Sequence, residues 1–163
     1  SLSAIDLGGD ITPPVLVDAS ANRLQIDTSN GPQTITFTLH ITDDLAGVRS
    51  VQIGFRHQLG YNESRECQQW PDPYNRDTTL LCAVEWPQYS AEGKWIVTWL
   101  SMSDGVGNWT DGNVADCVRF ESNRCTQFAY NENATEAIRA IETLVVPAVP
   151  GEDPPLYLPL VIR

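Results

Sequence analysis

The chain has 163 residues, which is enough for one domain of ordinary size with its own hydrophobic core. Its formal net charge is −11, which would repel the phosphates of nucleic acids and anionic lipids, so neither is expected as a partner. No stretch approaches the ~18 consecutive apolar residues of a membrane helix, and we expect no membrane insertion. The first residue is Ser1 and not Met, which fits a processed mature chain.

Apolar residues alternate with polar ones in several short segments, and this period of two predicts β-strands. The clearest segment is residues 33–42, QTITFTLHIT, where isoleucine, phenylalanine and leucine alternate with threonine and histidine. The other predicted strands, in chain order, are residues 13–20, 22–29, 48–55, 93–104 and 142–149. Short strands separated by turn residues indicate an all-β, immunoglobulin-like antiparallel β-sandwich.

The strand predicted at residues 93–104 carries apolar side chains at odd and even positions alike. One predicted face holds Ile96, Leu100 and Met102, and the other holds Trp95, Val97 and Trp99. We therefore expect both faces of this strand to be covered.

One short helix of about two turns is predicted at residues 133–141, NATEAIRAI. Asn133 can cap its first turn, and Glu136 lies three residues further on, as in a capping box. Ile138 and Ile141 then fall on one face, which we expect to be buried.

The four cysteines, Cys67, Cys82, Cys117 and Cys125, allow three disulfide pairings. We favour Cys67–Cys82 and Cys117–Cys125, since each pair closes a short loop rich in turn residues. A zinc site is the alternative, although the spacings contain no C-x-x-C. Paired cysteines indicate an oxidising compartment, so we expect a secreted, extracellular or cell-surface protein.

The two cysteine pairs lie in segments without a clear strand pattern, about residues 57–92 and 110–132, which we interpret as disulfide-stapled insertions. The first segment also carries Trp70, Tyr74, Trp86 and Tyr89. Exposed rings beside polar residues could stack on sugar rings or anchor a protein partner. In the alternative interpretation, the rings cover the sandwich edge and fill the disulfide loop.

Two acidic loops share one sequence frame: residues 41–48, ITDDLAGV, and residues 102–109, MSDGVGNW. Asp43 matches Asp104, and Gly47 matches Asn108, whereas Asp44 has only a glycine opposite it. Each loop follows a predicted strand, and a further aspartate precedes the first strand. In a sandwich of the expected type, these three places lie at one pole.

This arrangement would bring together five oxygen-bearing side chains: Asp10, Asp43, Asp44, Asp104 and Asn108. Crowded carboxylates repel one another unless something neutralises them, and Ca²⁺ accepts ~6–8 oxygen ligands in flexible geometry. The alternative is a pure turn role, because Asp and Asn bond to their own backbone in tight turns. The two roles are compatible, so calcium remains a candidate cofactor.

The segments DITPPV, TITFTLHITDDLAGVRSVQIGF and GKWIVTWLSMSDGVGNW resemble the immunoglobulin-like or cadherin-like modules of bacterial secreted and surface proteins. The resemblance covers about residues 10–56, 93–110 and 133–149, and it includes the helix before a final strand. It implies a spacer, an adhesin, a filament subunit or an appendage of a secreted hydrolase. Calcium held at one pole by Asp43 and Asp104 is implied by the cadherin-like relatives.

Residues 150–163, PGEDPPLYLPLVIR, differ in composition from residues 1–149, which we assign to the sandwich. A Pro/acidic spacer leads into an apolar run that resembles the C-terminal ends of secreted proteins of the Chloroflexus group. This tail could dock on its own sandwich or add as a strand to a neighbouring subunit. The residues that would make the contact are Leu156, Tyr157, Leu158, Leu160, Val161 and Ile162.

The sequence contains no convincing active site, so we expect the protein not to be an enzyme. Neither of its two histidines, His40 and His57, lies in a G-x-S-x-G or H-x-x-x-H motif, and we expect His40 on the polar face of a strand. We predict a non-catalytic extracellular structural or adhesion protein that self-associates through its tail into a surface filament or layer. The alternative is a carbohydrate-binding or spacer module of a secreted hydrolase, with surface glycans as its partner.

Overall fold

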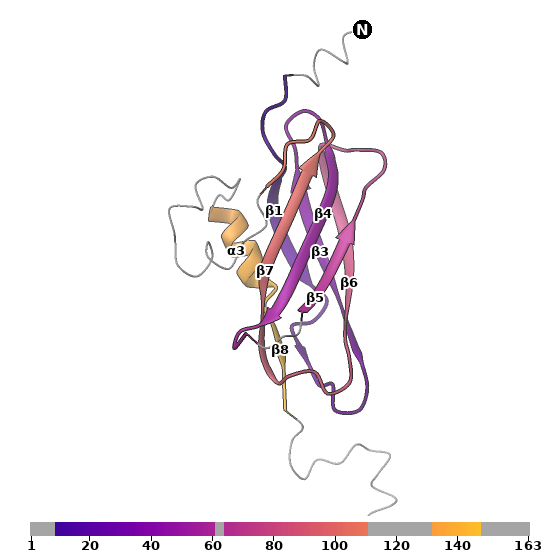
Figure 1. Cartoon of the computed structure of the whole chain (residues 1–163), viewed down its shortest axis with the longest axis vertical. Helices are drawn as coiled ribbons and strands as arrows, with labels where there is room; N and C mark the ends of the chain where they lie inside the picture. Colours follow the sequence, from indigo (N-terminus) through magenta and orange to yellow (C-terminus); the bar gives the residue numbers. More distant parts are fainter. Residues whose placement is uncertain (1–8, 61–63, 111–131, 148–163) are drawn as a thin grey trace, which may run out of the picture.

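The computed structural model describes residues 9–60, 64–110 and 132–147. Within them the chain forms two packed β-sheets, which confirms the predicted all-β sandwich (Figure 1). One sheet has the order β1 (Val15–Ala21), β3 (Gln33–Thr42), β6 (Asp77–Trp86). The other has the order β2 (Gln25–Ile26), β8 (Thr143–Val145), β7 (Gly93–Asp104), β4 (Val48–His57), β5 (Ser64–Gln69).

From each strand to the next the chain changes sheet, except between β4 and β5 and between β7 and β8. All described pairings are antiparallel except that of β2 with β8. Strands β1, β3 and β6 thus take the places of A, B and E in an immunoglobulin-like sandwich, and β4, β7 and β8 take those of C, F and G. The loop after β3 and the loop after β7 therefore lie at the same end of the molecule.

The segment predicted as an insertion at about residues 57–92 is instead part of the sandwich. Strand β5 lies at the edge of the larger sheet, and β6 pairs with β3 along ten residues, from Gln33↔Trp86 to Thr42↔Asp77. The prediction was wrong because β5 has the sequence SRECQQ, in which only the cysteine is apolar. The backbone hydrogen bonds to β4 hold this polar edge strand, and its pattern carries little signal.

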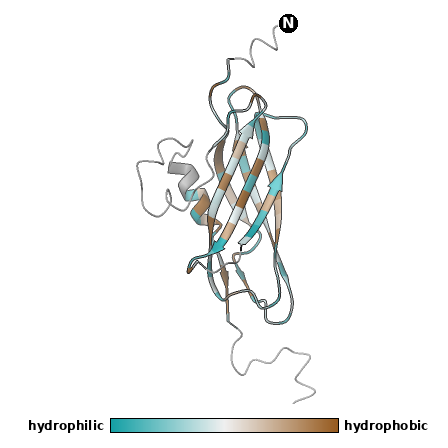
Figure 2. Cartoon of the chain, viewed as in Figure 1, coloured by the Kyte–Doolittle hydropathy of each residue, from teal (hydrophilic) through white to brown (hydrophobic). Residues whose placement is uncertain are grey.

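The sandwich core is centred on four aromatic rings, two from each sheet. Phe37 and Phe55 stack across the two sheets with ring centroids 4.6 Å apart. Trp86 and Trp95 meet edge to face at 6.0 Å, and all four side chains are fully buried. Figure 2 shows apolar residues alternating with more polar ones along the strands, so one face of each strand supplies this core.

The two predicted faces of the strand at 93–104 do not match the structure. A register shift in the pairing with β4 leaves one extra residue, Thr98, between Val97 and Trp99. Odd-numbered residues therefore face the core before this bulge, and even-numbered residues face it after the bulge. The β7 residues of the core are Trp95, Val97, Leu100 and Met102, whereas Trp99 is exposed.

The helix, α3 (Glu132–Ala140), confirms the prediction of one short helix within the described residues. It begins one residue before the predicted cap, so Asn133 lies in its first turn. Ile138, and Ile141 just after the helix, are buried in the core as expected. Figure 1 shows α3 lying against the side of the sandwich. After the helix, Leu144 and Val146 donate their backbone N–H groups to the carbonyls of Leu24 and Ile26, at strand β2.

The disulfide between Cys67 and Cys82 confirms one of the two predicted pairings. It joins β5 to β6 and therefore links the two sheets, where the sequence had suggested a local loop. The pair Cys117–Cys125 and the tail at residues 150–163 lie outside the described residues. No helix among the described residues is long and apolar enough to span a membrane.

Candidate metal centre

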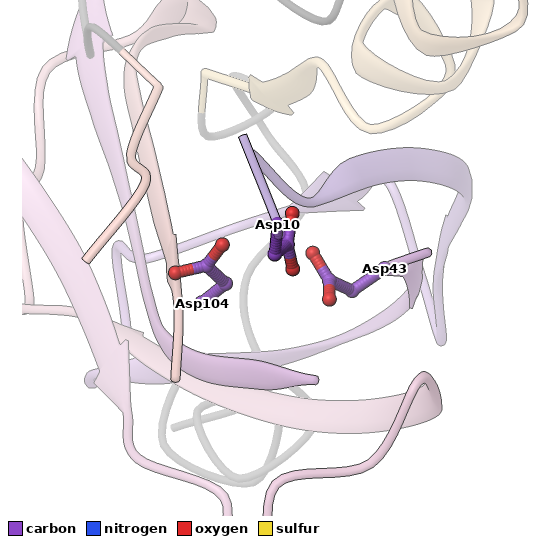
Figure 3. Close-up of side chains that lie close together, drawn as sticks. All are labelled: Asp10, Asp43 and Asp104. Carbon is purple, nitrogen blue, oxygen red and sulfur yellow. The ribbon is translucent and has the colours of Figure 1, made fainter. Parts of the chain in front are cut away.

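Three buried aspartates from separate segments meet at one pole of the sandwich (Figure 3). Asp10 precedes β1, Asp43 follows β3, and Asp104 is the last residue of β7. Their side chains are 7%, 7% and 0% exposed. One carboxylate oxygen from each lies within 4.8 Å of the others, so the three negative charges share one small site.

The Asp43 carboxylate closes its own loop through one oxygen and leaves the other without a partner. Its Oδ2 accepts hydrogen bonds from the backbone N–H of Gly47 at 2.6 Å and of Leu45 at 3.2 Å. Gly47 has φ 83°, a conformation that favours glycine and lets the chain turn back. The Oδ1 atom is buried and has no hydrogen-bond partner among the described residues.

The Asp104 loop repeats this arrangement, as the shared sequence frame predicts. Its Oδ1 accepts the backbone N–H groups of Val106, Gly107 and Asn108 at 2.9, 2.7 and 2.8 Å. Its Oδ2 accepts the side-chain amide of Asn108 at 2.6 Å. Each matched aspartate thus bonds to the N–H four residues further along its loop. The turn role expected for both residues is present in the structure.

Asp10 ties these two loops together. Its Oδ2 accepts the backbone N–H of Ala46 at 2.8 Å, within the first loop. Its backbone carbonyl accepts the side-chain amide of Asn108 at 3.1 Å, from the second loop. Gly105 donates its N–H to the carbonyl of Gly47 at 3.0 Å, so the loops also bond directly.

Asp44 and Asn108 occupy different positions relative to the three carboxylates. Asp44 is exposed and accepts a hydrogen bond from the hydroxyl of Thr12 at 2.7 Å. It is not one of the three buried carboxylates, but its side chain contacts that of Asp10. Asn108 is half-buried at the edge of the group, and its amide turns toward Asp104 and Asp10.

The electrostatics of the group set Asp43 apart. Burial raises the pKa of Asp43 above its ordinary 3.8, the charges of Asp10 and Asp104 add to the rise, and the bonds from Gly47 and Leu45 only partly oppose it. Burial also acts against ionisation of Asp10, but the hydrogen bonds from Thr12 and Ala46 outweigh it and lower the pKa of Asp10. Of these two carboxylates, Asp43 is therefore the one that gains more from a neighbouring positive charge.

The donor set fits a calcium ion. With Ca²⁺–oxygen bonds of ~2.3–2.6 Å, one ion can touch oxygens that are up to ~5 Å apart. The three carboxylates lie within this span, at 4.8 Å or less. The buried, unpartnered Oδ1 of Asp43 is the independent sign of a ligand, because a buried acceptor without a partner costs free energy. Figure 3 shows the carboxyl group of Asp43 turned toward that of Asp10.

The four aromatic residues proposed as a ligand surface do not lie together. Trp86 is fully buried in the core, so its assignment to an exposed surface was wrong. Tyr89 is 77% exposed, but it follows the end of β6 that is remote from the carboxylates. Trp70 and Tyr74 are 63% and 49% exposed and line one hollow between β5 and β6.

Both histidines have structural contacts. His40 lies half exposed on β3, and its Nε2 is 2.8 Å from a carboxylate oxygen of Asp77 on the neighbouring strand. The ring of His57 is buried and hydrogen-bonds to the carbonyl of Glu92 and the N–H of Leu59. His40 thus lies on the polar face of its strand, as expected.

Sequence reasoning missed a third loop at this pole, residues 70–76. Tyr74 packs so closely on the two acidic loops that a Cβ on Gly47 would lie 2.8 Å from its backbone, and one on Gly105 would lie 2.9 Å from its ring. The absence of side chains at these two glycines was the available signal. It could not name Tyr74, because the contact joins residues far apart in the sequence.

The fold and the site together define a class: an all-β sandwich with a buried carboxylate cluster that links three loops at one pole. Comparisons add no family to this description. A scan of the chain against family models found no match, and a search of the curated proteins found none.

Proposed function

We propose that the protein is a non-catalytic extracellular structural module that binds one Ca²⁺ ion at the Asp10–Asp43–Asp104 pole. The observation that carries this proposal is the buried Oδ1 of Asp43, which has no hydrogen-bond partner among the described residues and belongs to a group of three carboxylates. A divalent cation would offset their mutual repulsion and supply the missing partner.

The ion would act as a cross-link between segments that the fold brings together only at this pole. Asp10 and Asp43 flank strands of the smaller sheet, and Asp104 ends a strand of the larger sheet. Binding that occurs only in the folded state stabilises that state by mass action. A calcium-loaded pole would therefore be more rigid than the same pole without the ion.

We also propose an extracellular location and self-assembly for the protein. The Cys67–Cys82 disulfide supports an oxidising, extracellular compartment, where calcium is also plentiful enough for a weak site. In that setting the apolar tail, at residues 150–163, would join neighbouring copies into a filament or surface layer. This part rests on the composition of the tail.

Calcium binding is tested by thermal unfolding of the full chain with and without EDTA. EDTA should lower the melting temperature of the wild type, and the double variant Asp43→Ala/Asp104→Ala should lose this sensitivity. An EDTA-insensitive wild type would leave these aspartates with their turn role alone. Repeating the titration with Mg²⁺ tests selectivity, since Mg²⁺ requires a tighter octahedral site.

Assembly is tested by deleting residues 150–163. The truncated chain should remain folded and monomeric, whereas the full chain should polymerise. Electron microscopy distinguishes the two outcomes, and filaments formed by the truncated chain would contradict the role given to the tail.

A second candidate function, carbohydrate binding, is favoured by one observation. Trp70 and Tyr74 are exposed and line the same hollow next to the carboxylate pole.

A further inference from the structure

A hollow of about 550 Å³ lies at the carboxylate pole, beside the acidic loops. Its lining consists of Arg49, Trp70, Pro71, Asp72, Pro73 and Tyr74. Its volume falls in the range of ~300–1,000 Å³ that is typical of small-molecule sites. Aromatic side chains as exposed as Trp70 and Tyr74 mark binding surfaces when they gather in one place.

The loop that forms this hollow is fixed to the acidic loops by backbone contacts. Val48 donates its N–H to the carbonyl of Asn75 at 2.9 Å, and Asp43 donates its N–H to the carbonyl of Arg76 at 2.8 Å. The Arg76 side chain returns a bond from Nε to the carbonyl of Leu45 at 2.9 Å. The wall of the hollow is thus held in place by the same loops that carry the carboxylates.

The Tyr74 ring connects the hollow to the second acidic loop. A side chain on Gly105 would clash with this ring, because its Cβ would lie 2.9 Å from Cδ2 of Tyr74. Gly105 directly follows Asp104, so a shift of the Asp104 loop would move the surface on which Tyr74 rests. The geometry of the hollow therefore depends on the order of the carboxylate pole.

The chemistry of the lining favours a neutral sugar. An indole face matches the apolar C–H face of a pyranose ring, and the same hollow offers a hydrogen-bond donor in Arg49 and an acceptor in Asp72. A sugar hydroxyl pair needs both kinds of partner. The net charge of −11 disfavours nucleic acids and anionic glycans, so among carbohydrates a neutral sugar is the fitting ligand.

We propose that this hollow is a carbohydrate-binding site in which a pyranose ring stacks on Trp70, while the acidic loops hold Tyr74 in place. The proposal rests on the proposed calcium site in one respect only, namely that the bound ion would fix the geometry of the loops. Arg49 and Asp72, which also line the hollow, bind hydroxyl groups of the sugar.

The experiment uses the full chain loaded with Ca²⁺ and hexasaccharides of cellulose, chitin, xylan and mannan as probes. Each is titrated by calorimetry, and the indole N–H signals of the five tryptophans are followed by NMR. Binding of at least one probe is expected, and Trp70→Ala should weaken it at least ~10-fold, the loss typical of a central aromatic contact. Tyr89→Ala removes a similarly exposed ring at the other end of the sandwich and should leave the affinity unchanged.

The result that overturns the proposal is the absence of binding to all four probes, or binding that Trp70→Ala leaves intact. A polyproline decapeptide is titrated in parallel, and Trp70-dependent binding of that peptide alone would assign the hollow to a protein partner and overturn the carbohydrate site. Calcium titration of the same samples separates the two proposals. Sugar binding without calcium binding contradicts only the metal centre, and calcium binding without sugar binding contradicts only the carbohydrate site.

Discussion

Replacing Asp43 by asparagine is predicted to change stability in opposite directions with and without calcium. The substitution keeps the size of the side chain and an oxygen that can accept the bonds now made by Gly47 and Leu45. The new amide nitrogen can take the place of the unpartnered Oδ1 and donate to a neighbouring carboxylate. The variant therefore removes the charge without removing the turn.

The expected gain without calcium follows from the distances in the site. Two carboxylates 4.8 Å apart repel each other by ~0.9 kcal/mol in water and by ~3.5 kcal/mol at an effective dielectric constant of ~20. The Asp43→Asn substitution would remove two such pairs, but the wild type can relieve part of the repulsion by binding a proton. We expect the variant to be more stable than the wild type in EDTA by ~1–2 kcal/mol, or ~2–8 °C in melting temperature.

Calcium should reverse this order. At a calcium concentration ~100 times the dissociation constant, binding adds ~2.7 kcal/mol to the stability of the wild type. The variant lacks one charged ligand and should gain much less. The wild type then becomes the more stable protein, so the two stability curves cross as calcium is added.

Urea unfolding in EDTA and in calcium measures both differences. Asp44→Asn is the matched control, because it removes the same charge from the adjacent, exposed position outside the buried group. Asp18→Asn, which removes a charge from an exposed position on β1, is a second control, and it should change stability little in either condition. If Asp43→Asn lost as much stability in EDTA as in calcium, charge repulsion in the site would be unimportant, because Asp43 would then act through its turn bonds alone.

Three further predictions concern the pole and the sheets. In EDTA the stability of the wild type should fall as pH rises above 3.8, because the folded state raises the pKa of Asp43 and holds its proton more tightly than the unfolded chain does. Asp10 has a lowered pKa in the folded state, so the stability that it contributes is lost only as the pH falls below 3.8. Melting curves of Asp43→Asn at pH values above 3.8 should lack the fall seen for the wild type. The double variant Cys67→Ala/Cys82→Ala should lower the free energy of unfolding in urea by ~3 kcal/mol, because it releases a 15-residue loop that links the two sheets. A decrease of less than ~1 kcal/mol would contradict a stabilising role for this disulfide. Gly47→Ala should cost more stability than Gly60→Ala and should weaken calcium binding, because both have positive φ but only Gly47 contacts Tyr74. Equal losses in the two glycine variants would mean that the contact with Tyr74 is unimportant.

The acidic loops show which part of the site a single sequence can predict. The frame shared by residues 41–48 and 102–109 identified Asp43 and Asp104, and both close their loops in the same way. The topology of the expected sandwich then placed Asp10 at the same pole. The two loops were found because short-range turn chemistry and strand alternation are properties of local sequence, whereas Asp10 required the fold class as well.

The errors came from contacts between distant segments. Trp86 was assigned to the surface because β6 was not recognised, although its pairing with β3 buries the ring completely. The bulge at Thr98 reversed the expected faces of β7, and register shifts of this kind depend on the partner strand. The close packing of Tyr74 on two glycines likewise requires the assembled fold.

Calcium titration of metal-free full chain by calorimetry tests the metal centre most directly. One ion should bind per chain, and this binding should be lost in Asp43→Ala/Asp104→Ala but retained in Asp18→Asn, where the charge removed is exposed on β1. Absence of binding at the millimolar calcium concentrations that weak extracellular sites require, or equal binding by the double variant, would contradict it.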